Sequence, residues 1–162
     1  MRRFFKSFAW AGRGFATAVR HERNLRFHLC VGVYVYLLSL FYPFTAVHYV
    51  VLTLLVAGVL ALELVNSAIE RIVDHLAPKY NMQAGLIKDI AAAAVLVFCI
   101  GAAVCGFVLF WNLEVFAQIG RWFAARPLLI VLLAASLALC GWLVFGLGPK
   151  QKEGKDTEPY EQ

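Results

Sequence analysis

The segment ALELVNSAIERIVD, residues 61–74, places acidic and amide side chains at the end of a long apolar run. In an α-helix, which has about 3.6 residues per turn, five of these polar side chains share one face. A charged side chain at the middle of a bilayer costs about 2.5–3.5 kcal/mol, so such a face indicates a functional site. These five residues, the acidic stripe, are Glu63, Asn66, Ser67, Glu70 and Asp74.

The composition is that of an integral membrane protein. Of the 162 residues, 62% are hydrophobic and 15% are charged, whereas a soluble domain has about 25% charged residues. The mean hydropathy is +0.73. The net charge of +5 does not indicate a nucleic-acid partner, because the basic residues flank apolar segments and therefore set membrane orientation. The four cysteines lie singly in apolar segments, which argues against a disulfide framework or a zinc site.

The N-terminal segment, residues 2–20, is amphipathic. Lys6, Arg13 and Arg20 recur every seven residues, and phenylalanines follow another side. This pattern predicts a helix that lies in the headgroup plane of the membrane. An Arg-rich targeting peptide has a similar composition, but the helical pattern continues into charged residues without a plausible cleavage site.

A polar collar, residues 21–28 with the sequence HERNLRFH, precedes the first apolar segment. Arg23 and Arg26 suit anchoring at the lipid surface. Glu22 is harder to explain in this way, since it is the only acid among the first 62 residues.

The membrane-spanning segments follow from the length of the uncharged runs. Residues 27–62 contain no Lys, Arg, Asp or Glu, and this run is too long for one crossing of about 20 residues. Pro43 divides it into two helices joined by a tight turn. We predict spans at 28–42, 46–73, 90–113 and 127–147, an interfacial segment at 114–126, and a charged, disordered tail at 149–162.

Orientation follows from the positions of the basic residues. Four spans place thirteen of the fifteen Lys and Arg residues on one side of the membrane, and leave Arg121 and Arg126 on the other. Cytoplasmic loops carry this excess of positive charge. Both termini, and the aqueous end of the acidic stripe, are therefore predicted to be cytoplasmic.

The residue types in the stripe suit phosphoryl transfer to a lipid alcohol. Mg²⁺ binds one or two carboxylates together with phosphate oxygens and water, so Glu70 at the aqueous end is a candidate ligand, joined by Glu22. Glu63 lies about 10 Å deeper along the helix, where partial burial suits a general base. Lys88 is placed to hold phosphates, and Asn66 to orient the base or the hydroxyl.

These residues resemble a known family. The motif E-x-x-N-[ST]-A-x-E, the Lys-Tyr and Lys-Asp pairs that follow it, and the ERNLRFH collar are similar to the small bacterial diacylglycerol and undecaprenol kinases. The likeness covers residues 3–112, and the collar resembles the undecaprenol branch more. It leaves the choice between undecaprenol and diacylglycerol open.

The resemblance implies a homotrimer in the bacterial cytoplasmic membrane, with active sites shared between chains and MgATP as donor. It implies Glu63 as the proton acceptor, Glu22 and Glu70 as the metal ligands of the ATP complex, and Arg26 as a lipid contact together with Glu63 and Asn66. The remaining implied active-site and nucleotide-contacting positions are Arg3, Trp10, Lys79, Tyr80, Asn81, Lys88 and Asp89. Asn81 stands where members of the family often carry His.

The predicted organisation is a kinase core at 1–113, then the interfacial segment and an additional fourth span at 114–148, then the tail. The class is all-α and integral to the membrane: a surface helix, a three-helix core and one extra helix. An ion- or proton-coupled transporter is the alternative, but its acids should lie at mid-bilayer on several helices. A non-catalytic assembly protein would explain Asn66 and Ser67 as interhelical contacts, but not Glu63 together with Glu70.

Overall fold

The computed structural model describes residues 2–79 and 81–147, without the side chains of residues 2 and 3. Every regular element in this part of the chain is an α-helix, which confirms the predicted all-α class. The predicted tail at 149–162 lies outside the described residues. The helices are α1 Arg2–His21, α2 Arg23–Ser39, α3 Ala46–Leu76, α4 Met82–Phe110, α5 Leu113–Ala124 and α6 Pro127–Gly146.

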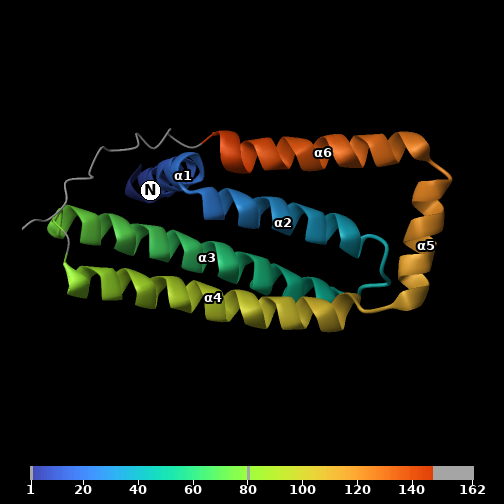
Figure 1. The fold of residues 1–162 in the computed structure, drawn as a ribbon, viewed down its shortest axis with the longest axis horizontal. Helices are drawn as coiled ribbons and strands as arrows, with labels where there is room; N and C mark the ends of the chain where they lie inside the picture. The colour runs from blue at the N-terminus through green and yellow to red at the C-terminus, as the bar shows by residue number, and fades with distance from the viewer. Residues whose placement is uncertain (1, 80, 148–162) are drawn as a thin grey trace, which may run out of the picture.

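Four helices run side by side in the order α6, α2, α3, α4 (Figure 1). The α1 helix lies at the end of this row where α2 begins and α3 ends, and α5 crosses the opposite end (Figure 1). The start of the chain, the α3–α4 connection and the end of α6 therefore lie at one end of the bundle, as an even number of crossings requires.

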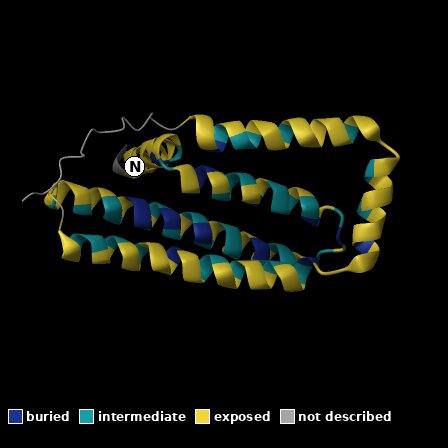
Figure 2. Cartoon of the chain, viewed as in Figure 1, coloured by how far each residue is buried: buried dark blue, intermediate teal, exposed yellow. Residues whose placement is uncertain are grey.

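Three of the described helices, α3, α4 and α6, are long and apolar enough to cross a membrane. Their outer surfaces are mostly exposed, whereas the buried positions follow α3 (Figure 2). The predicted first span at 28–42 corresponds to a shorter helix. Its residues 28–39 lie in α2, which has 17 residues and at 1.5 Å per residue is about 26 Å long, and residues 40–42 belong to the turn that follows. Residues 23–28 of the polar collar lengthen α2, whereas His21 ends α1 and Glu22 lies between the two helices.

Helix boundaries differ most at α4. The predicted span begins at residue 90, but α4 begins at Met82. The reason is an N-cap: the Asn81 side chain accepts a hydrogen bond from the Gln83 backbone N–H at 2.9 Å, which satisfies one of the unpaired donors at the helix start.

The end of the bundle near α5 is held by buried aromatic contacts. Tyr42, in the α2–α3 turn, donates a hydrogen bond to the Phe110 carbonyl at 2.7 Å, and the two rings meet edge to face with centroids 5.1 Å apart. On α5, Trp122 packs edge to face on Phe41 at 5.3 Å. The interfacial segment therefore packs on the bundle as a helix.

The α3 and α4 helices approach each other closely at Gly58. A Cβ there would lie 2.3 Å from the Phe98 ring, so a larger residue would force that ring to move. Two small residues four apart, Ala102 and Gly106, are typical of close helix contact, but nothing lies within 4 Å of a Cβ at Gly106. Both residues instead line a cavity.

Candidate active site

The acidic stripe lies on one side of α3 and becomes more exposed toward the end of the helix. Glu63 and Asn66 are 4% and 6% exposed, and Ser67 is also buried. Glu70 is half-buried, and Asp74 is exposed. The carboxylates of the stripe therefore extend from a buried position to the surface, in the order that the sequence predicted.

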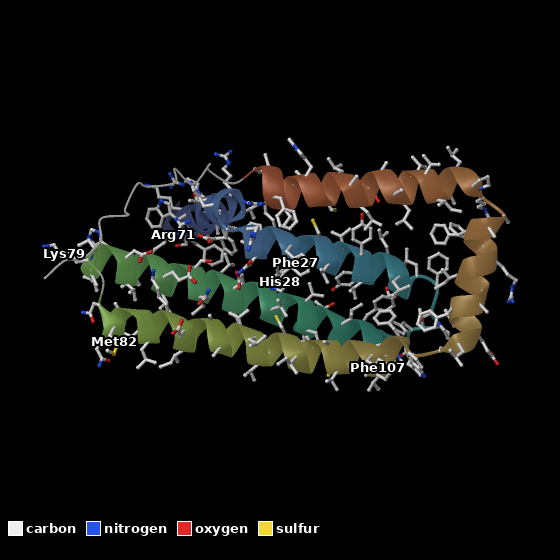
Figure 3. The ribbon with its side chains drawn as sticks, in the orientation of Figure 1. Phe27, His28, Arg71, Lys79, Met82 and Phe107 are labelled. Atoms are coloured by element: carbon white, nitrogen blue, oxygen red, sulfur yellow. The ribbon has the colours of Figure 1, made fainter. Side chains whose placement is uncertain are left out.

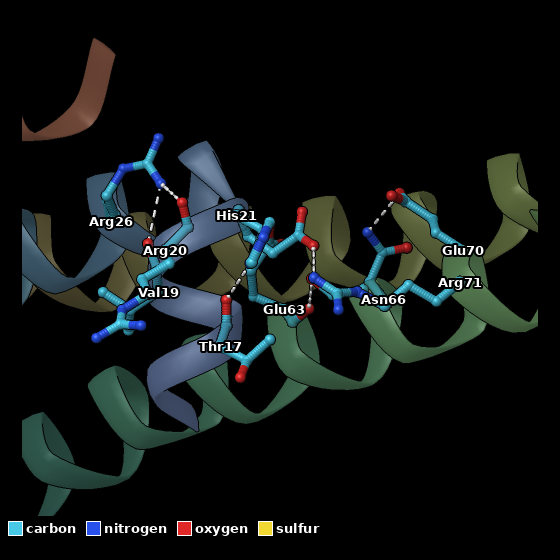
Figure 4. A network of polar contacts seen from close by, with 11 residues as sticks. Thr17, Val19, Arg20, His21, Arg26, Glu63, Asn66, Glu70 and Arg71 are labelled. Carbon is cyan, nitrogen blue, oxygen red and sulfur yellow. Dashed lines mark hydrogen bonds and ion pairs between the residues drawn. The ribbon is translucent and has the colours of Figure 1, made fainter. Parts of the chain in front are cut away.

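Hydrogen bonds within α3 fix the middle of the stripe. The Asn66 amide donates to Glu70 Oε1 at 2.9 Å (Figure 4). The Ser67 hydroxyl donates to the Glu63 backbone carbonyl, also at 2.9 Å. The Asn66 Oδ1 atom is buried and has no hydrogen-bond partner among the described residues. Because buried acceptors are nearly always paired, this oxygen marks a place where a ligand can bind.

Two residues from the α1–α2 corner complete the acidic cluster. Glu22 lies between the two helices and accepts a bond from Arg71 of α3 at 2.9 Å. Asn24 is within hydrogen-bonding reach of the Glu63 carboxylate, and the charges of Glu70 and Glu22 both act on that carboxylate. Glu22, Glu63 and Glu70 are thus brought together within one chain.

The donor chemistry of this cluster fits a magnesium ion that arrives with phosphates. No group of three His, Cys, Asp or Glu residues in the described part of the chain is placed to hold a metal by itself. Mg²⁺ needs only one or two carboxylates when phosphate oxygens and water fill its other positions. Glu22 and Glu70 supply such carboxylates, and the unpaired Asn66 oxygen adds a polar acceptor beside them.

The α3–α4 connection forms a cationic pocket beyond the stripe. A cavity of about 250 Å³ is lined by Asp74, Lys79, Asn81 and Lys88 among others. Lys88 forms an ion pair with Asp74. Figure 3 shows Arg71 and Lys79 at this end of α3. Two lysines against one aspartate give the lining of this pocket a net positive charge, which suits an anionic ligand such as a phosphate.

The other predicted site residues that the structure describes lie outside the acidic cluster and the cationic pocket. Trp10 is 61% exposed on α1, and Asp89 is exposed at the start of α4. The Arg3 side chain and Tyr80 lie outside the described residues. Arg26 is buried, and its guanidinium binds backbone carbonyls of α1 and α6.

Sequence reasoning assigned no role to Arg71 or Asn24. The position of Arg71 directly after Glu70 could have indicated a cation close to the acidic stripe. The position of Asn24 two residues after Glu22 is a weaker indication that it belongs to the site.

An apolar cavity of about 470 Å³ lies between α2, α3 and α4. It ends near Val59, one helical turn before Glu63 on the same face of α3. Figure 3 shows Phe27 and His28 at the part of α2 nearest the acidic end, and Phe107 toward the opposite end of α4. The lining residues of this apolar cavity include Phe27, His28, Val35, Val59, Cys99 and Gly106.

Comparison with known proteins agrees with this arrangement. A family model described as prokaryotic diacylglycerol kinase matches residues 9–110. An undecaprenol kinase from Bacillus subtilis (strain 168) is 37% identical over 68% of this chain and 89% of its own length. A diacylglycerol kinase from Synechocystis sp. is 38% identical over 61% of this chain and 56% of its own length, and one from Escherichia coli (strain K12) is 28% identical over 68% and 90%.

Membrane-length helices with a carboxylate cluster at one end, together with these matches, define a membrane lipid kinase. The chain belongs to the prokaryotic diacylglycerol kinase family. This result favours the kinase over the transporter that the acidic residues alone left open. The family match ends at residue 110, so α5 and α6 lie beyond it.

Proposed function

We propose that this protein transfers the γ-phosphoryl group of ATP, bound with magnesium, to the hydroxyl of a lipid alcohol at the cytoplasmic membrane surface. The observation that carries the proposal is the depth order of the acidic residues. Glu63 is buried beside the apolar cavity, whereas Glu70 and Glu22 lie nearer the cationic pocket. A hydroxyl anchored in the membrane and a nucleotide from water can therefore meet between them.

Each residue has a defined task in this reaction. Glu63 accepts the hydroxyl proton while the alcohol oxygen attacks the γ-phosphorus, and the bond to the bridging oxygen of ADP breaks. The unpaired Asn66 oxygen is available to orient the hydroxyl. Glu22 and Glu70 would hold the magnesium, which neutralises phosphate charge when it is bound. Lys88 and Lys79 bind the phosphates electrostatically.

The nucleotide-binding residues from α1 and the α3–α4 connection extend this assignment. We infer that Trp10, Asn81 and Asp89 contact the nucleotide, with Arg3 and Tyr80 at the corresponding family positions. Asn81 already caps α4 through Oδ1, which leaves its amide N–H groups to donate to a ligand.

We propose that the lipid is a long isoprenoid alcohol such as undecaprenol. The cavity whose lining includes Val59, one helical turn from Glu63, is lined mainly by apolar side chains, with His28 and Cys99 as the exceptions. Diacylglycerol carries two ester groups close to its hydroxyl, and burying them unpaired costs free energy. A polyprenol has only its hydroxyl to satisfy.

We further propose a homotrimer in the bacterial cytoplasmic membrane, with both termini in the cytoplasm and active sites completed by a neighbouring chain. The distribution of Lys and Arg supports this orientation. The outer faces of α4 are exposed and apolar, with Val97 and Val108 at 70% and 73%, so they suit contact with lipid or with another copy of the chain.

Purified protein in lipid nanodiscs, with magnesium and ATP labelled at the γ-phosphate, tests the function. Undecaprenol and diacylglycerol are supplied in parallel. We expect label in undecaprenyl phosphate and at least about tenfold less in phosphatidic acid. Faster labelling of diacylglycerol would reject the isoprenoid assignment, and no labelling of either lipid would reject the lipid alcohol kinase.

A further inference from the structure

The Arg26 side chain joins the ends of two helices that are far apart in sequence. It lies in the first turn of α2 and is 5% exposed. Its Nε and one Nη donate to the Val144 carbonyl of α6, at 3.3 and 2.9 Å. Its other Nη donates to the carbonyls of Val19 and Arg20 at the end of α1, at 2.9 and 3.0 Å (Figure 4). Every nitrogen of the guanidinium is therefore bonded to backbone.

These bonds are favourable because of where the carbonyls lie. The last four carbonyls of a helix have no partner within it, and the end of the helix carries partial negative charge. A buried acceptor left unpaired costs about 1–3 kcal/mol. The planar guanidinium reaches several carbonyls at once with its fixed set of donors, which a lysine ammonium cannot do.

The corner that Arg26 holds contains Glu22. This residue alone separates α1 from α2, and its backbone is extended, with φ −97° and ψ 112°. Its side chain makes no capping bond, so the carboxylate is free to pair with Arg71. Because Arg26 holds the end of α1 just before Glu22, it restricts the angle at which the chain turns through Glu22.

The α6 helix is fixed along α2 by further contacts. Tyr34 donates a hydrogen bond to the Ser136 hydroxyl at 2.9 Å. The Arg23 guanidinium lies 5.7 Å from the centre of the Phe145 ring. The last turn of α6 therefore presents the Val144 carbonyl to Arg26 from a supported position.

We propose that Arg26 is a positioning residue for phosphoryl transfer, which uses the ends of α1 and α6 to hold Glu22 at the metal-binding side of the site. The α6 helix is thereby part of the framework of the active site. This inference rests on the proposed function, in which Glu22 is a metal ligand, and it differs from the expectation that Arg26 contacts the lipid.

The test compares full-length variants in nanodiscs, with kinetics and hydrogen exchange measured on the same samples. Arg26→Gln should raise the magnesium concentration for half-maximal rate about tenfold, as loss of a residue that orients a ligand does. Its KM for the lipid should stay within about twofold of the wild type. Arg26→Lys keeps the positive charge but loses the planar guanidinium with its several donors, and it should also raise the magnesium requirement. Arg13→Gln removes an exposed charge from α1 without touching these carbonyls and should match the wild type within about twofold.

Hydrogen exchange at the end of α1 supplies a readout that is independent of catalysis. Amides of the last turn of α1 should exchange several-fold faster in Arg26→Gln than in Arg13→Gln. A raised lipid KM with an unchanged magnesium requirement would overturn the proposal in favour of a lipid contact, and unchanged exchange in both Arg26 variants would overturn the bridge. A wild-type protein that transfers no phosphate would instead reject the proposed function, and the exchange data would still show whether the bridge holds α1.

Discussion

Replacing Glu63 with Gln removes the proposed base while keeping the shape of the side chain. Glu63 is 4% exposed, so a smaller residue would leave a cavity that confuses the result. A positioned general base contributes about 10²–10⁴-fold to a rate. We therefore expect kcat to fall at least about 10²-fold, which corresponds to about 2.7 kcal/mol in activation free energy.

The same substitution should leave the folded protein intact. The Glu63 carboxylate lies within the field of two other acids, Glu70 and Glu22, and like charges at close range repel. An amide has no charge to repel, and it retains a polar group for Asn24. The midpoint of thermal unfolding in detergent should therefore be equal to that of the wild type or higher, and the oligomer should elute at the same volume.

The assay is transfer of labelled phosphate to the lipid across a range of pH. In the wild type the rate should rise as Glu63 loses its proton, and Glu63→Gln should lack this dependence. Glu114→Gln is the matched control, because it removes an exposed carboxylate from the first turn of α5 at the opposite end of the bundle. A Glu63→Gln protein that assembles and turns over at the wild-type rate would refute the assignment of Glu63 as base.

Three further substitutions test other parts of the structure. Glu70→Gln should raise the magnesium requirement about tenfold or more, and an unchanged magnesium titration would count against its role as a ligand. Lys88→Met should raise the KM for ATP and leave the KM for lipid unchanged, since it removes a cation from the cationic pocket; an unaltered KM for ATP would contradict this. Tyr42→Phe should lower stability by about 1–3 kcal/mol, because the Phe110 carbonyl loses its donor. Unfolding in a denaturing detergent measures this change, and kcat should stay at the wild-type value.

The acidic stripe could be predicted from the sequence because its information is local. Helical periodicity alone placed Glu63, Asn66 and Glu70 on one face, and the structure confirms the shared face and the change in burial along it. The spans α3, α4 and α6 could be predicted equally well, since an apolar segment of membrane length has few structures open to it other than a membrane-spanning helix.

The end of α4 nearest the site could not be predicted in the same way. A polar segment after Pro78 reads as a loop by composition, and the Asn81 cap that starts the helix at Met82 depends on one side-chain geometry. The consequence is functional: the cationic pocket is formed between two helix ends, where Lys88 can reach Asp74, instead of along a long loop.

Contacts between residues that are distant in the chain could not be predicted from the sequence. Arg71 and Glu22 are 49 positions apart, and no periodicity relates them. Their ion pair joins α3 to the α1–α2 corner, and it is what brings a carboxylate from a second segment to the stripe.

The bridge formed by Arg26 shows why the fourth span looked peripheral in the sequence. Its partner on α6 is the backbone carbonyl of Val144, and any residue at that position presents the same carbonyl. Recognition of a backbone group therefore leaves no trace in residue type, while the apolar side chains of α6 report only that it can cross a membrane. The family match, which ends at residue 110, is silent about α6 for a related reason, since it records the residues that relatives share. A helix added outside that match can still support the active site, provided that it delivers an unpaired carbonyl to an arginine that the core already contains.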